Sequence, residues 1–149
     1  MKMDWLRRVR GAVFMGLTWA VVWAPIAVLA GLVVDPDGSM DEMWVAIGAY
    51  PGFLCGVVFF AVLRIAEGRR GLDELPLSRV AAWGAVPGLL VGVLPFTIGE
   101  STSKLPLWQL AAIVLGSFTL LSAVSAVGSA SFLRYAARRR APARAATQG

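Results

Sequence analysis

The chain has 149 residues, of which 58% are hydrophobic and only 15% are charged, and its mean hydropathy is +0.71. An average globular protein has about 45–50% apolar and about 25% charged residues, so a soluble domain of this length could not bury the excess. The composition excludes a disordered chain, a coiled coil, a disulfide scaffold and almost any soluble enzyme. It indicates an integral membrane protein.

Four stretches of the chain contain no Asp, Glu, Lys or Arg, and they hold 24, 21, 20 and 29 residues. About 20 apolar residues in a helix cross a hydrocarbon core of about 30 Å. Lipid offers no partner for backbone polar groups, and the alternation of a β-barrel is absent, so the spans should be helices. We therefore predict an all-α fold of four transmembrane helices in an antiparallel bundle (residues 1–134), followed by a basic tail (135–149). The predicted spans cover about 11–34, 43–65, 79–99 and 105–133.

The basic residues are distributed unequally among the segments that flank these spans. Thirteen of the fourteen lie before the first span, between the second and third, or after the fourth, and Lys104 is the exception. Short loops rich in Lys and Arg stay on the cytoplasmic side. This pattern predicts a multi-pass protein of the bacterial inner membrane with both termini in the cytoplasm. The net charge of +5 then indicates attraction to anionic lipids and not to nucleic acid.

Glycines recur every four residues in the second and third spans, at Gly48, Gly52, Gly56, Gly84, Gly88 and Gly92. Residues 48–57 and 84–93 are identical at seven of ten positions. Glycines at this spacing form a groove that lets another helix backbone approach closely. We interpret the repeat as a glycine zipper used twice in inverted orientation, with the two grooves meeting across a pseudo-two-fold axis. Each copy carries a proline that is expected to bend its helix, and transporters also use inverted repeats with broken helices.

Few residues in the sequence point to chemistry. There is no histidine, and no charged side chain lies in the interior of the four spans, because Arg64 and Arg79 stand only at span ends; this argues against an ion-coupled transporter. The acidic loop 35–42 has an Asp-x-Asp-Gly core that is compatible with calcium. Ser39 and Glu42 in that loop also have the spacing of a capping box for the second span, and we prefer this structural interpretation. The sequence thus predicts no catalytic residue, no metal site and no cofactor.

Two tryptophans and a group of arginines are the remaining candidates for contact residues. Trp19 and Trp23 lie one turn apart inside the first span, where an indole N–H has few partners. One interpretation is that they donate to a neighbouring carbonyl within the bundle. The other is that they contact a partner helix, a lipid, or a quinone or pigment. Arg138, Arg139 and Arg140 follow the last span and are predicted to contact partners or lipid.

Taken together, these features favour a protein that holds others in place. We expect a non-catalytic accessory or structural subunit that braces a larger bacterial membrane complex, such as a respiratory or photosynthetic assembly. Its partners would be other integral membrane subunits and anionic lipids. The alternative is a small uncoupled channel or carrier that acts as a homo-oligomer, built on the inverted glycine repeat. Nothing in the sequence supports an enzyme.

Overall fold

The structure is a computed structural model that describes residues 2–34, 36–38, 41–68, 72, 74–98 and 105–145. These residues form four helices and short connections. All four helices are long and apolar enough to cross a membrane, which confirms the predicted number of candidate spans and the all-helical class. The helices are α1 (Lys2–Val34), α2 (Asp41–Glu67), α3 (Leu77–Ile98) and α4 (Leu107–Ala145). The expected capping box at Ser39 lies outside the described residues.

Local signals in the sequence set several helix boundaries. After α2 ends at Glu67, Gly68 has a φ of +62°, the left-handed conformation that commonly ends a helix and that glycine adopts without strain. A proline precedes both α3 and α4. The carbonyl group of Pro76 accepts two first-turn N–H groups of α3 at 3.0 and 3.1 Å, and that of Pro106 does the same for α4. Both helices of the second half therefore begin in the same way.

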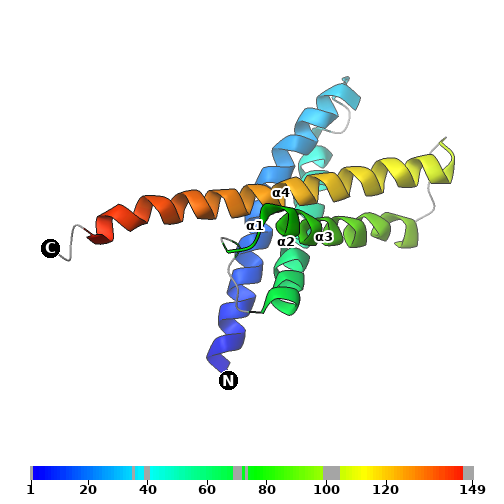
Figure 1. Cartoon of the computed structure of the whole chain (residues 1–149). Coiled ribbons are helices and arrows are strands. Elements are labelled where there is room, and N and C mark those ends of the chain that lie inside the picture. The colour runs from blue at the N-terminus through cyan, green and yellow to red at the C-terminus, as the bar shows by residue number, and fades with distance from the viewer. Residues whose placement is uncertain are drawn as a thin grey trace.

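The four helices are arranged as two pairs that cross one another (Figure 1). α1 packs along α2, and α3 packs along α4, whereas contacts between the pairs are fewer, and most of them run from α2 to α3. In Figure 1 the α1–α2 pair runs vertically and the α3–α4 pair horizontally, with α4 extending on both sides of the crossing. The sequence led us to expect one bundle of aligned helices. The crossed arrangement differs from that expectation.

The glycine grooves of α2 and α3 do not face each other. Gly48, Gly52 and Gly56 lie against α1, where a Cβ atom on Gly56 would come within 2.7 Å of the Met15 carbonyl oxygen. Gly84, Gly88 and Gly92 lie against α4. The expected meeting of the two grooves across a pseudo-two-fold axis is therefore corrected: each groove receives the helix next to it in the chain. Consecutive elements joined by short connections usually pack together, and the glycines let their backbones approach.

The prolines of the repeat do not end the helices, because α2 continues through Pro51 and α3 through Pro87. One turn before Pro87, the carbonyl oxygen of Gly84 accepts a hydrogen bond from the Ser122 hydroxyl of α4 at 2.5 Å. Serine side chains and neighbouring helices commonly satisfy the backbone groups near a proline in a membrane helix. The small residues of α3 thus allow both close packing and a polar contact with α4.

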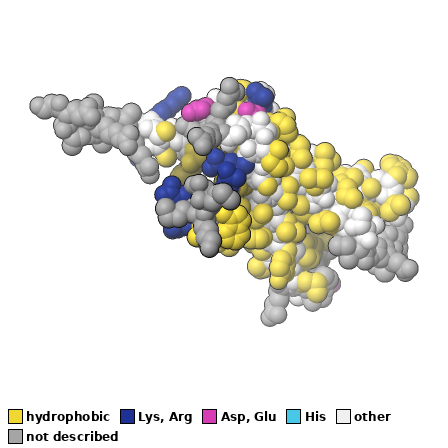
Figure 2. All heavy atoms as spheres, turned by 90° about the horizontal axis from the view of Figure 1, so that it is seen from below, with side chains coloured by type: hydrophobic (Ala, Val, Ile, Leu, Met, Phe, Trp, Pro, Cys, Tyr) yellow, Lys and Arg dark blue, Asp and Glu magenta, His cyan; other side chains and the backbone are white. Residues whose placement is uncertain are grey.

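Most of the apolar side chains lie on the outside of the molecule. Only 11–33% of the most apolar window of each helix is buried. Figure 2 shows hydrophobic side chains covering much of the visible face, with the Lys and Arg side chains gathered towards one end. Water-soluble monomers rarely expose contiguous apolar patches larger than a few hundred Å². The outer surface therefore fits a lipid environment.

Two glycines on the α3–α4 pair test the role of close packing. A Cβ atom on Gly88 would lie 2.5 Å from the Phe118 carbonyl oxygen, whereas one on Gly116 of α4 would meet nothing within 4 Å. We expect Gly88→Ala to lower the free energy of unfolding by about 1–3 kcal/mol through overpacking. Gly116→Ala should leave it unchanged or raise it by up to about 1 kcal/mol through helix propensity. Unfolding of both variants in mixed detergent micelles measures the difference, and equal effects would contradict the packing described here.

Candidate functional site

The two helix pairs are joined where they cross by a group of aromatic and serine side chains, which we call the junction: Trp19, Trp23, Phe59, Phe118, Ser125 and Ser129. The Trp19 ring stacks on the rings of Trp23 and Phe59, with centroid distances of 6.4 and 5.2 Å. The ring of Phe118 from α4 and the ring of Trp23 are arranged edge to face, with a centroid distance of 5.7 Å. Aromatic pairs in these geometries each contribute about 0.5–1.5 kcal/mol beyond the area that they bury.

The indole N–H groups of the junction connect α1 to α4. Trp23 Nε1 donates to Ser125 Oγ at 2.9 Å, and Trp19 Nε1 donates to Ser129 Oγ at 3.3 Å. Ser129 Oγ in turn donates to the Ser125 carbonyl oxygen at 2.8 Å. The acceptors of the two indoles are therefore hydroxyl groups of the other helix pair, where we had expected a carbonyl group. Trp19 and Trp23 are 1% and 3% exposed, and their contact with a quinone or pigment stays a prediction.

Two apolar grooves lie beside the junction, in the angle between the helix pairs. The first has a volume of about 320 Å³ between α1, α2 and α4, and Trp23, Trp44 and Ile113 are among its lining residues. The second has a volume of about 400 Å³ between α2, α3 and α4, and its lining includes Tyr50 and Phe118. Both grooves are lined almost entirely by apolar side chains. They exist because the pairs diverge from the crossing point and leave part of each helix uncovered.

A buried carboxylate that the sequence analysis missed links the end of α2 to the start of α3. The Glu67 side chain is 2% exposed, and its Oε1 atom lies 2.8 Å from Arg79 Nε. The same oxygen accepts a hydrogen bond from Trp83 Nε1 at 2.9 Å. Arg79 and Trp83 lie one turn apart on α3, so both reach the same oxygen. Glu67 lies four residues after the uncharged stretch that ends at Leu63, with Arg64 between them. No signal in the sequence indicated its burial, because the sequence could not show which side chains of α3 would face it.

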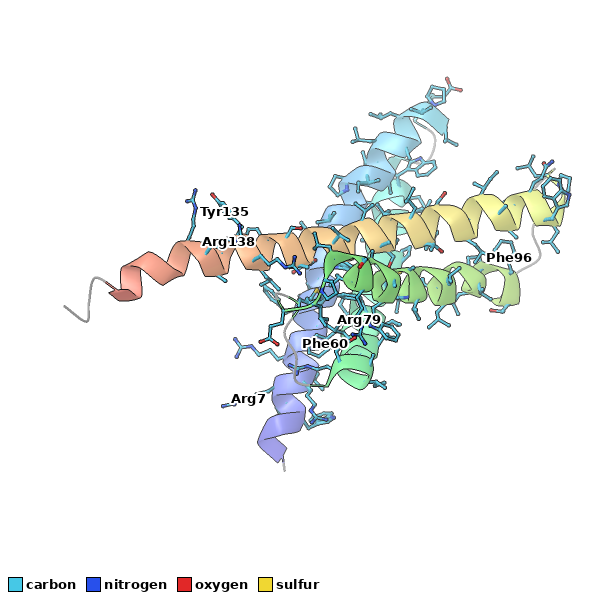
Figure 3. The ribbon with its side chains drawn as sticks, viewed as in Figure 1. Arg7, Phe60, Arg79, Phe96, Tyr135 and Arg138 are labelled. Atoms are coloured by element: carbon cyan, nitrogen blue, oxygen red, sulfur yellow. The ribbon has the colours of Figure 1, made fainter. Side chains whose placement is uncertain are left out.

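The arginines that follow the apolar part of α4 have different surroundings (Figure 3). Arg138 lines a hollow near the start of α3, together with Arg134. The guanidinium of Arg139 lies 4.7 Å from the centre of the Tyr135 ring on the exposed side of the helix, a cation–π geometry. The side chain of Arg140 lies outside the described part of the chain. The structure thus separates Arg138 from Arg139, which the sequence had grouped together.

No protein-family model, curated protein or solved structure matches the chain in sequence or fold comparisons. Among the described residues, no three His, Cys, Asp or Glu side chains lie close enough to hold a metal ion. The class of the protein therefore follows from its helices alone. Four helices that could cross a membrane indicate a multi-pass α-helical membrane protein.

The bond between Trp23 and Ser125 can be tested with a double-mutant cycle. Either Trp23→Phe or Ser125→Ala removes one partner, and the second substitution then costs less because the hydrogen bond is already lost. We expect a coupling energy of about 0.6–2 kcal/mol, the range for polar contacts between membrane helices. Unfolding in mixed micelles measures it. Trp23→Phe combined with Ser131→Ala, at an exposed serine of α4, is the control and should be additive, and additivity in both cycles would exclude the bond.

Proposed function

We propose that the chain is a non-catalytic accessory subunit that braces a larger bacterial membrane complex, such as a respiratory or photosynthetic assembly. Its partners would be other integral membrane subunits. The observation that carries this proposal is the pair of apolar grooves in the angle between the crossed helix pairs. A transmembrane helix of a neighbouring subunit could lie in this angle and touch both pairs at once.

The residues that line the grooves are of the types found where helices of different subunits meet. Tryptophan, tyrosine and phenylalanine are enriched in the cores of protein interfaces, and all three types line the grooves, through Trp44, Tyr50 and Phe118. Gly48 is also part of the lining of the first groove, and small residues favour close approach between helices in lipid. Contact with both pairs would hold the angle between them constant.

The length of α4 gives the proposal further support. α4 has 39 residues and α3 has 22, which correspond to about 58 and about 33 Å at 1.5 Å per residue. The C-terminal part of α4 extends beyond the rest of the molecule (Figure 1). A short helix without tertiary contacts is only marginally stable in water, so a neighbouring subunit or the membrane surface would stabilise this extension.

The proposed orientation places both termini in the cytoplasm of a bacterial cell. Basic side chains gather towards one end of the molecule (Figure 2), and the positive-inside rule assigns such an end to the cytoplasmic side. The alternative, an uncoupled channel or carrier formed by several copies, has less support. The aromatic rings of the junction occupy the crossing point of the helix pairs, and the two grooves beside it are apolar, which does not suit the passage of a polar solute through one copy.

Substitutions on α4 test whether the grooves receive other subunits. Ile113 lines the first groove, and Leu120 is an exposed residue of the same helix that lines neither groove. We expect Ile113→Trp to fill part of the groove and to reduce the membrane subunits that co-purify in mild detergent by about tenfold, which corresponds to about 1.4 kcal/mol. Leu120→Trp should leave their recovery unchanged. Intact-mass measurement of the purified complex provides the subunit list and the stoichiometry.

Two results would contradict the proposal. One is the recovery of the wild-type chain from its native membrane without other subunits in constant ratio. The other is a monodisperse homodimer that moves a solute across the membrane of liposomes, which would favour the channel or carrier.

A further inference from the structure

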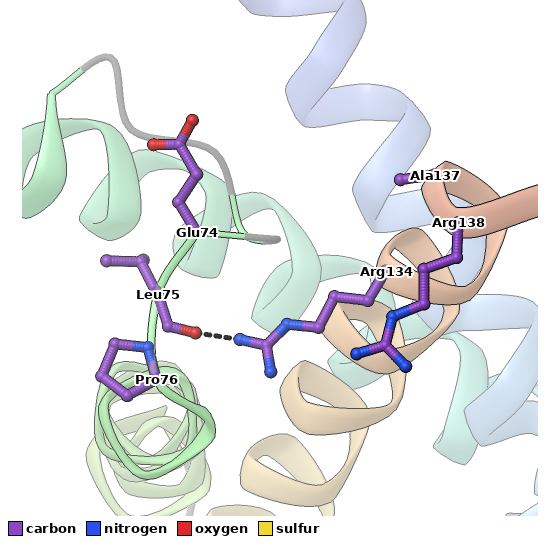
Figure 4. A pocket seen from close by; sticks show the side chains of 6 residues that line it. All are labelled: Glu74, Leu75, Pro76, Arg134, Ala137 and Arg138. Carbon is purple, nitrogen blue, oxygen red and sulfur yellow. Dashed lines mark hydrogen bonds between the residues drawn. The ribbon is translucent and has the colours of Figure 1, made fainter. Parts of the chain in front are cut away.

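We propose that the hollow between the start of α3 and the C-terminal part of α4 binds the phosphate group of an anionic glycerophospholipid. The hollow has a volume of about 520 Å³ and is lined by Glu74, Leu75, Pro76, Arg134, Ala137 and Arg138 (Figure 4). This site goes beyond the proposed function, because it belongs to the single chain and does not require another subunit.

The hollow lies where the uncharged stretch of α4 ends and the apolar span of α3 begins. The uncharged stretch of α4 ends at Leu133, and Arg134 is the next residue. The opposite wall of the hollow consists of the residues just before α3, whose apolar span starts at Leu77. The apolar segments of α3 and α4 therefore end beside each other at the hollow. In a membrane, apolar segments end at the boundary between hydrocarbon and headgroups.

Two arginines, Arg134 and Arg138, line the hollow, and neither takes part in a salt bridge within the described part of the chain. Arg134 Nη2 donates to the Leu75 carbonyl oxygen, and this bond holds the guanidinium at the wall (Figure 4). Arg134 Nε is buried and has no partner among the described residues. Arg138 follows one turn later and lines the same hollow. The only ion pair found in the described part of the chain joins Glu67 and Arg79.

Glu74 is the one acidic residue of the lining, and it does not pair with either arginine. Its carboxylate points away from both guanidinium groups in Figure 4, and the residue is exposed. Two guanidinium groups beside each other repel, and a phosphate oxygen between them would remove this repulsion. Arginine binds phosphate well because its N–H groups match the spacing of the phosphate oxygens.

Apolar surface beside the hollow favours a lipid over free phosphate. Leu77 and Leu133 flank the lining residues in sequence and are 40% and 43% exposed. Acyl chains of a bound lipid would lie along this surface while its phosphate group occupies the hollow. Inorganic phosphate could make only the polar contacts.

Native mass spectrometry of the full chain in detergent, titrated with phosphatidylglycerol, tests the site. We expect Arg138→Gln to weaken binding about tenfold, because one charge-assisted contact is lost. Arg139→Gln is the matched control, since it removes the same charge from the next residue, which does not line the hollow; it should change binding less than twofold. Phosphatidylcholine should bind the wild-type chain at least tenfold more weakly than phosphatidylglycerol.

Three outcomes would overturn the proposal. Equal weakening by Arg138→Gln and Arg139→Gln would mean that only the overall charge of the helix attracts lipid. Equal binding of the two lipids would remove the preference for an anionic headgroup. Displacement of phosphatidylglycerol by millimolar inorganic phosphate would show that the acyl chains contribute nothing. Arg134→Gln is not used as the main variant, because Arg134 also holds the Leu75 carbonyl group.

Discussion

Helices that are surrounded by lipid gain no hydrophobic free energy by associating, because lipid tails are as apolar as their own side chains. The two helix pairs of this chain are joined instead by the contacts of the junction and by those of Glu67 with Arg79 and Trp83. Two indole N–H groups of α1 donate to two serine hydroxyls of α4, and stacked aromatic rings fill the space around them. An indole N–H left without an acceptor in a dry interior would be costly. The serines of α4 thus provide the acceptors that the buried indoles of α1 need where the pairs cross.

The two helices of one pair are held together in a different way. There, glycine brings two backbones together: the glycines of α2 face α1, and those of α3 face α4. This division leaves each pair tightly packed and the contact between the pairs small. A crossed shape follows, with two apolar grooves beside the junction in the angle between the pairs. Exposed apolar grooves between helix pairs are suited to packing against other membrane subunits. For this reason we favour an accessory subunit over a catalyst.

The sequence predicted the helices well because their signals are local. Uncharged runs of 20 or more residues indicated four spans, and the structure has four helices of the required length and hydropathy. The partners of the helices were harder to predict. The repeat at Gly48–Gly56 and Gly84–Gly92 predicted surfaces of close helix packing. The spacing of glycines does not show which helix packs against each surface. Some contacts depend on how the helices lie relative to one another, which the spacing of residues along the chain does not show. These are the acceptors of Trp19 and Trp23 and the surroundings of Glu67 and Arg138.

The crossed arrangement can be tested most directly by a distance measurement. Asp37, in the connection after α1, and Leu107, at the start of α4, lie at the tips of different helix pairs and are both exposed. Spin labels at Asp37→Cys and Leu107→Cys, in a chain that also carries Cys55→Ala, would report their separation in lipid nanodiscs by pulsed electron paramagnetic resonance. We expect a distance several times the 8–10 Å between the axes of packed helices. A distance close to that spacing would place the two tips side by side, as in an aligned bundle, and would contradict the crossed structure.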